Sequence, residues 1–176
     1  MEIIDTKIMD IKEDIKTDIE KISEKERTAK FLIFDFDGKK FALGIEKIKR
    51  VVNIVELTPL PKAPEFVIGL INIQGDIIPV IDMRKILKFK ESEINLSNKL
   101  IITQNYNHGM ALLVNNISEL EEFSETDMQE PEKIFNDIKY VEKVIVTKDG
   151  MILIPDIENM LSKKESESLI DSIKSK

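Results

Sequence analysis

Residues 69–84 read GLINIQGDIIPVIDMR, and this stretch decides the fold class. Gly75-Asp76 separates two apolar runs that are rich in β-branched residues. This arrangement is typical of two strands joined by a tight turn. Pro79 has no N–H to donate, so we expect the second strand to lie at a sheet edge or to carry a bulge there. Apolar residues on both strand faces indicate a hairpin buried between two layers.

Similar hairpins are predicted elsewhere in the chain. Three more pairs of apolar runs flank turns that contain Gly, Asp or Asn: 31–36 with 40–45, 99–103 with 110–114, and 140–147 with 151–155. Short strands at this spacing predict an all-β sandwich or small barrels.

The segments between these hairpins are less regular. We expect a helical turn or an irregular strand at 45–55 and a short helical turn at 84–88. The acidic segment 119–132 is expected to be loosely structured. From Asp156 the pattern becomes helical, with Ile157, Met160 and Leu161 on one side.

Composition excludes several classes of protein. The 176 residues are 42% hydrophobic and 34% charged, which is typical of one globular domain or of two small subdomains with a shared core. No run reaches the roughly 20 apolar residues of a membrane span, and the charged N-terminus lacks a signal-peptide core. The absence of cysteine excludes disulfides and thiolate chemistry and favours the cytoplasm. A net charge of −7 without a basic stripe argues against nucleic acid and against an anionic membrane surface.

Residues 1–28 form a separate amphipathic segment. Their shared feature is a stripe of isoleucines at intervals of three and four, at positions 4, 8, 11, 15, 19 and 22. We expect a helix that packs on its own domain or frays. The alternatives are a short coiled coil or a helix that docks on a partner. The tail, 162–176, is expected to be an exposed helix or to fray.

The sequence offers no catalytic constellation. His108 is the only histidine, so the chain cannot form a multi-histidine metal site, and any Ser-His catalytic pair would have to use this one residue. Asp76 and Asp82 share strand parity and could converge, but Pro79 disturbs the alternation between them. Asp82 is expected to bind Arg84 or backbone amides instead. We therefore expect a binding protein and not an enzyme, with no metal and no cofactor.

The pattern Gly-x-x-Asn-x-x-Gly-x-x-x-Pro-Val-x-Asp-x-Arg, in residues 69–84, strongly resembles the CheW family of bacterial chemotaxis coupling proteins. Further matching stretches follow in family order: 31–34, 41–51, 111–120 and 149–161. The resemblance implies a mainly β domain over residues 29–161, built as two small five-stranded SH3-like β-barrels packed on each other. A helical extension would precede this domain and a short C-terminal helix would follow it.

The resemblance also implies a function. It predicts a non-catalytic cytoplasmic adaptor that couples chemoreceptors to a chemotaxis histidine kinase. One barrel would contact the kinase's regulatory domain, and a groove near the junction would receive the tip of a chemoreceptor. The receptor-side candidates by motif position are Ile48, Arg50, Gly69, Gln74, Gly75 and Leu120, with Ile77 on the same surface or on its kinase-facing neighbour. The alternative is an SH3-like interaction module of another signalling or scaffolding pathway.

Three positions depart from the family's usual residues. Arg50 stands where the family usually has Glu, and Gln74 stands where it usually has Arg. Asn115 replaces a usual Asp. The usual Glu and Arg suggest an ion pair near the receptor groove. If Arg50 and Gln74 are neighbours, the arginine can still donate to the glutamine amide oxygen.

Overall fold

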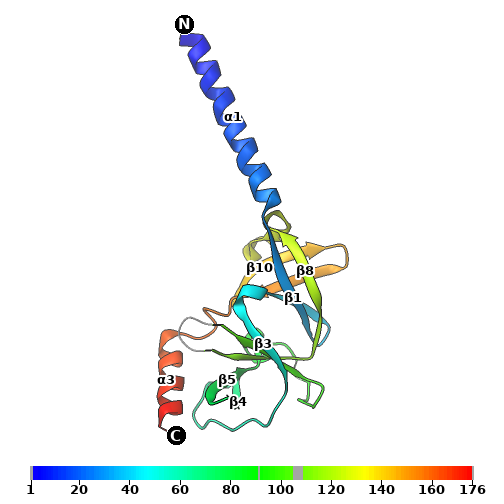
Figure 1. Cartoon of the computed structure of the whole chain (residues 1–176), viewed down its shortest axis with the longest axis vertical. Coiled ribbons are helices and arrows are strands. Elements are labelled where there is room, and N and C mark those ends of the chain that lie inside the picture. Colours follow the sequence, from blue (N-terminus) through cyan, green and yellow to red (C-terminus); the bar gives the residue numbers. More distant parts are fainter. Residues whose placement is uncertain (1, 91, 105–108, 176) are drawn as a thin grey trace.

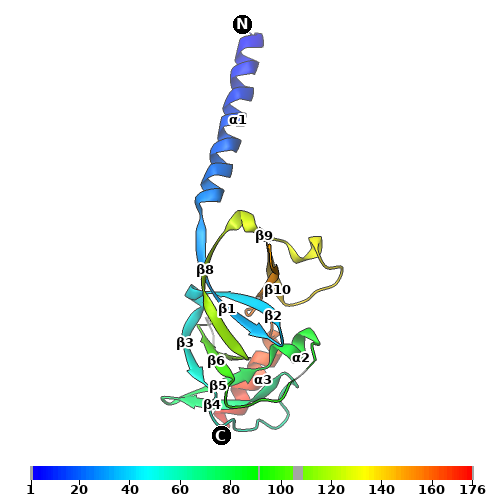
Figure 2. The same cartoon turned by 90° about the vertical axis from the view of Figure 1, so that its right-hand side faces the viewer.

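The computed structural model describes residues 2–90, 92–104 and 109–175, without the side chains at 2, 3, 5 and 24–26 (Figures 1 and 2). The helices are α1 Glu2–Glu26, α2 Met83–Leu87 and α3 Lys163–Lys174, with short 3₁₀ turns η1 Ile45–Lys47, η2 Glu125–Asp127 and η3 Pro131–Lys133. The first strands are β1 Thr28–Phe36, β2 Lys39–Gly44, β3 Ile48–Asn53, β4 Val67–Ile73, β5 Asp76–Ile81 and β6 Lys99–Thr103. The remaining strands are β7 Ala111–Val114, β8 Asn116–Ser124, β9 Met128–Gln129, β10 Val141–Thr147 and β11 Gly150–Pro155.

The strands form two sheets, which confirms the predicted mainly β fold. Within the described residues, one sheet has the order β8-β1-β2-β11-β10-β9 and the other has the order β3-β6-β7-β5-β4. The second sheet is therefore an insertion between β2 and β8 of the first. The first sheet has six strands where five were expected, because the two-residue strand β9 pairs with β10.

The core consists of three apolar clusters, because each sheet buries both of its faces. One cluster lies on the six-stranded sheet alone and includes Ile33, Ala42 and Ile152. A second lies on the five-stranded sheet and includes Leu100, Ile102 and Leu113. The third contains residues of both sheets, among them Phe41, Ile101 and Leu112. Successive residues of one strand therefore enter different clusters, as the period of two requires. This explains why the strands are almost continuously apolar.

The predicted central hairpin is confirmed as β4 and β5, with two corrections. The turn residues are Gln74 and Gly75, with φ of 55° and 95°, and Asp76 already begins β5. Pro79 does not lie on an edge strand, because β5 pairs with β4 on one side and with β7 on the other. The predicted alternative, a bulge, has a counterpart in β4, where the register shifts between Val67 and Gly69, opposite Ile81 and Val80. The pairing of β5 with β7 begins only at Val80. In the pairing of β5 with β4, hydrogen-bonded and non-hydrogen-bonded pairs alternate from the turn onward, and Leu70↔Pro79 is a non-hydrogen-bonded pair. Proline is tolerated there because neither ladder needs its missing N–H.

The expectation of a loosely structured segment at 119–132 is wrong for its first part. Strand β8 runs to Ser124 and pairs with β1 from Thr28↔Ser124 to Asp35↔Asn116. β8 is the edge strand of its sheet, and most of its residues are exposed or half-buried. Charged residues on such a strand prevent pairing with other chains, and they also hide its β pattern in the sequence.

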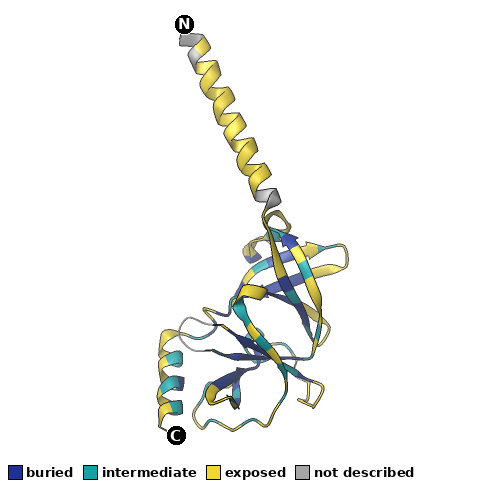
Figure 3. Ribbon diagram, viewed as in Figure 1, coloured by how far each residue is buried: buried dark blue, intermediate teal, exposed yellow. Residues whose placement is uncertain are grey.

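The N-terminal helix does not pack on its own domain, contrary to expectation. α1 projects away from the sheets as a single rod, and its described side chains are exposed along its length (Figures 1 and 3). Only its last turns approach the body, near β8 and η2. None of the helices among the described residues is long and apolar enough to span a membrane.

The C-terminal helix begins later than the apolar pattern indicated. Residues 156–161 form turns in which Ile157 and Met160 are buried. The helix α3 starts after Ser162, whose side chain accepts from the Glu165 backbone N–H while Glu165 accepts from the Ser162 N–H. This capping box fixes the start of the helix. α3 is docked on the body, because Leu169 is buried in the shared core cluster.

Candidate functional site

The tip of the β4–β5 hairpin is the exposed end of an otherwise buried element. Positive φ at both Gln74 and Gly75 matches the hairpin turn that follows the twist of the strands. The Asn72 side chain accepts a 2.9 Å hydrogen bond from the Gly75 backbone N–H, which holds the turn. The buried half of β5 anchors this tip, while Asp76 and Ile77 remain exposed.

Arg50 reaches this tip from the other side of the five-stranded sheet. Both its Nη1 and its Nη2 donate to Gln74 Oε1, at 3.4 Å each. Next to Arg50, the Lys49 ammonium lies 3.8 Å from an Asp76 carboxylate oxygen. β3 and β4 are the two edges of the sheet, so these contacts bring its edges together at the tip.

The predicted site residues do not all lie on one surface. Arg50, Gln74, Gly75 and Ile77 lie at or beside the tip; Ile77 is 42% exposed. We call these four residues the tip patch. Ile48 is half-buried and packs against the shared core cluster.

Gly69 is buried below the tip. A Cβ at this position would lie 3.0 Å from the Thr58 carbonyl oxygen and 3.1 Å from Leu57 Cβ, so a side chain here would push this segment away by a few tenths of an ångström. The packing of this segment therefore explains a glycine at position 69 without invoking contact with a binding partner.

Leu120 is separate from the tip patch. It lies on β8 of the six-stranded sheet, opposite Leu32 of β1, and is 61% exposed. Leu120 is therefore accessible, but on a different sheet from the other candidates.

A groove of about 740 Å³ lies beside the tip patch. Its lining includes Lys49, Asp76, Ile77, Ile102 and Ile173. Ile173 belongs to α3, which sequence reasoning treated as an exposed or frayed tail. The signal that could have identified it was the capping box at Ser162 together with Leu169, Ile170 and Ile173 on one helical face.

The two aspartates considered for chemistry do not converge. Asp76 is exposed beside Lys49, whereas Asp82 is buried and bound to Arg84. His108 lies outside the described residues. Among the residues that are described, no cluster of three or more His, Asp or Glu side chains could hold a metal ion.

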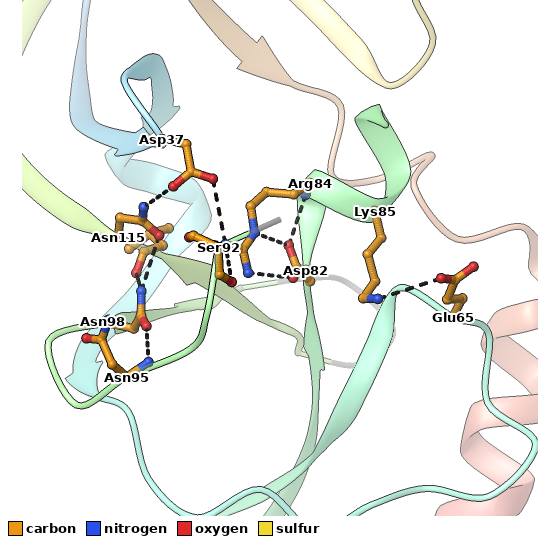
Figure 4. A network of polar contacts seen from close by, with 10 residues as sticks. Asp37, Glu65, Asp82, Arg84, Lys85, Ser92, Asn95, Asn98 and Asn115 are labelled. Atoms are coloured by element: carbon orange, nitrogen blue, oxygen red, sulfur yellow. Dashed lines mark hydrogen bonds and ion pairs between the residues drawn. The ribbon is translucent and has the colours of Figure 1, made fainter. Parts of the chain in front are cut away.

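The expected bond between Asp82 and Arg84 is present and fully buried (Figure 4). Asp82 Oδ1 accepts from Arg84 Nε at 2.9 Å, and Oδ2 accepts from Nη2 at 2.8 Å. Oδ1 also accepts from the Arg84 backbone N–H at 3.0 Å, which caps α2. The remaining guanidinium nitrogen, Nη1, donates to Ser92 Oγ at 2.7 Å. Such a paired and hydrogen-bonded buried charge is tolerated, whereas an unpaired one is not.

This ion pair belongs to a polar network that joins the two sheets. Arg84 Nη1 lies 3.8 Å from Asp37 Oδ2, in the turn between β1 and β2. Asn115 Nδ2 donates to Asp37 Oδ1 at 2.8 Å, and Asn115 Oδ1 accepts from the buried Asn98 at 3.2 Å. The departure at Asn115 thus has a structural role, because its amide both donates and accepts. A carboxylate there could not donate to Asp37.

Two ionisable groups have displaced pKa values. Burial, followed by the charge of Asp37, raises the pKa of Asp35 above its ordinary value. Burial alone would lower the pKa of Lys47, but the 2.9 Å bond to Glu142 and the charges of Glu142, Glu158 and Glu46 raise it overall. The shift at Lys47 is explained by its ion pair and needs no catalytic role.

Comparisons with known proteins agree with this architecture of two sheets. The family described as "CheW-like domain" matches residues 30–165. Chemotaxis protein CheW of Bacillus subtilis is 25% identical over 143 residues, covering 80% of this chain and 92% of that protein. Chemotaxis protein CheW of Rhizobium meliloti is 24% identical over 139 residues, covering 78% and 90%. The crystal structure of scaffolding protein TtCheW from Thermoanaerobacter tengcongensis superposes with a TM-score of 0.72 at 27% identity, covering 79% of this chain and 96% of that one.

The fold and its exposed tip thus define a small β-sheet scaffold. The chain belongs to the CheW-like domain family, as its sequence predicted. Its function is that of a chemotaxis coupling adaptor, and the alternative of an SH3-like module in another pathway is not favoured.

Proposed function

We propose that this adaptor couples chemoreceptors to the regulatory domain of a chemotaxis histidine kinase, in the cytoplasm and without chemistry of its own. The tip patch carries the proposal. Gln74 and Ile77 are exposed on the β4–β5 hairpin, Arg50 is half-buried on β3 and bonds to Gln74, and Ile77 lines the groove. Rigid exposed side chains beside a groove suit recognition of a helical partner.

The two partners would use different parts of the surface. We assign the receptor tip to Arg50, Gln74 and Gly75, with Ile48 and Gly69 shaping this surface from beneath. Leu120 is assigned to the receptor as well, as a second contact on β8. Ile77 faces the groove and belongs to the same surface or to the adjoining kinase contact.

Titration calorimetry with the purified kinase regulatory domain and with a receptor cytoplasmic fragment from the same cell tests the proposal. We expect binding of both by the wild-type chain and at least tenfold weaker binding of one of them by Ile77→Asp. Val146→Asp is the matched control, because Val146 is a β-branched strand residue of similar exposure (49%) on β10. Absence of binding at tens of micromolar, or equal losses in both variants, would contradict the proposal.

A kinase assay tests the absence of chemistry. Phosphate transfer should require the kinase and respond to added adaptor, and the adaptor alone should turn over nothing. A turnover activity of the isolated chain would contradict the adaptor function.

A further inference from the structure

Helix α1 carries an apolar face that the body of the protein leaves uncovered. Its six isoleucines at 4, 8, 11, 15, 19 and 22 are between 45% and 63% exposed. The helix spans 25 residues and lies outside the region, 30–165, that matches the family (Figure 3). A continuous exposed apolar stripe of this kind marks an interaction surface.

The isoleucines recur with a period of eleven residues. Ile4 and Ile15, Ile8 and Ile19, and Ile11 and Ile22 are each eleven positions apart. Eleven residues make about three turns, so all six side chains fall within roughly 80° of arc along the whole rod. A helix that packs along this stripe must have apolar residues at the same eleven-residue spacing. Another copy of α1 meets this requirement by its own sequence.

The charges beside the stripe also match a second copy. Lys12 and Lys16 lie on one flank of the stripe, and Asp14 and Asp18 lie on the other. Within one helix, each pair sets like charges four residues apart, which is unfavourable. In a parallel pair of helices, the lysine flank of one faces the aspartate flank of the other, and Lys16 is level with the span between Asp14 and Asp18.

An antiparallel pair would lose this match. With Ile11 opposite Ile15, the lysine flank would face the lysine flank of the second copy, and the aspartate flank would face the aspartate flank. We therefore propose that α1 is a self-association helix, which packs in parallel against α1 of other copies of this chain.

Self-association goes beyond the adaptor function and has a geometric consequence for it. Only Arg27 separates α1 from β1, so a parallel assembly holds the adaptor bodies at the same end of the helices. Two bodies held together can bind neighbouring partners, and the second contact then forms at a raised effective concentration.

Sedimentation equilibrium of the full chain tests self-association. We expect the mass of two or three 20.3 kDa chains at tens of micromolar for the wild type, and of one chain for Ile11→Lys with Ile15→Lys. The matched control is Thr6→Lys with Thr17→Lys, which adds the same charge at β-branched positions on the opposite face and should keep the assembly. A wild-type mass of one chain, an Ile variant that still assembles, or a Thr control that dissociates would overturn the proposal.

Disulfide trapping tests the orientation, because the chain has no native cysteine. Oxidation of Ile8→Cys alone should produce linked dimers in a parallel assembly. An antiparallel assembly would instead link Ile8→Cys chains to Ile19→Cys chains, and this result would overturn the parallel arrangement. The Ile11→Lys, Ile15→Lys chain should still bind the kinase regulatory domain in calorimetry, so failure of self-association is distinguishable from failure of the adaptor function.

Discussion

Arg50 and Gln74 join the two edge strands of the five-stranded sheet. The guanidinium donates twice to the amide oxygen, at 3.4 Å, across strands that are not neighbours in the sheet. The resemblance to the CheW family suggested an ion pair between a Glu and an Arg at these two positions. In this chain the two side chains make a neutral-acceptor hydrogen bond, worth on the order of 1 kcal/mol.

A double-mutant cycle at these positions tests whether the contact matters to partner binding. Gln74→Arg alone sets two cations side by side and should weaken binding. Adding Arg50→Glu restores an opposite-charge pair and should rescue it, with a coupling energy of roughly 0.5–3 kcal/mol. Calorimetric titration of the two single variants and the double variant measures this coupling. Simple additivity would mean that the two positions act independently on the partner.

Asn115→Asp should destabilise the fold by about 1–3 kcal/mol. The substitution removes the donor to Asp37 Oδ1 and places a second carboxylate against the first. Urea unfolding of Asn115→Asp measures the loss. Asn136→Asp is the control, since it makes the same chemical change at an exposed loop residue, and should stay within about 0.5 kcal/mol of wild type. Equal stability of the two variants would refute the role given to the Asn115 amide.

The Lys47–Glu142 ion pair predicts a loss of stability at alkaline pH. The pKa of Lys47 is raised in the folded state above its ordinary 10.5, so the folded chain holds this proton more tightly than the unfolded chain. Its contribution is therefore complete below about pH 10.5 and is lost as pH rises through the folded pKa. Unfolding free energies of wild type and Lys47→Met, measured from pH 9 to 12, should converge in that window. A gap that does not change with pH would show that Lys47 contributes by packing alone.

The sequence predicted the local elements of the fold better than their assembly. The hairpin at β4 and β5 was predictable because its alternatives, a helix or a loop, conflict with β-branched runs around Gly75. The bond between Asp82 and Arg84 was predictable because the two residues are two positions apart. Both features depend on short-range chemistry, which a single sequence displays directly.

Features that depend on distant contacts were harder to predict. β8 was mistaken for an irregular segment because its charged edge conceals the alternation that β1 stabilises from about 90 residues away. The packing of α3 was missed because the surface that buries Leu169 comes from other parts of the chain. The exposure of α1 was also missed, since an isoleucine stripe shows that a helix needs a partner but does not show which one.

Asp82→Asn should destabilise the protein far more than Asp76→Asn, although both residues lie in the same family motif. Asp82 neutralises a guanidinium that is 2% exposed, and its loss leaves this charge with the longer ion pair to Asp37 and with hydrogen bonds such as the one to Ser92 Oγ. Breaking a buried pair from one side costs about 3–5 kcal/mol. Asp76 is exposed beside Lys49, so its replacement should change the free energy of unfolding by less than about 0.5 kcal/mol. Urea titration of both variants measures the difference. Similar stability of the two variants would mean that Ser92 and Asp37 suffice to hold the Arg84 charge.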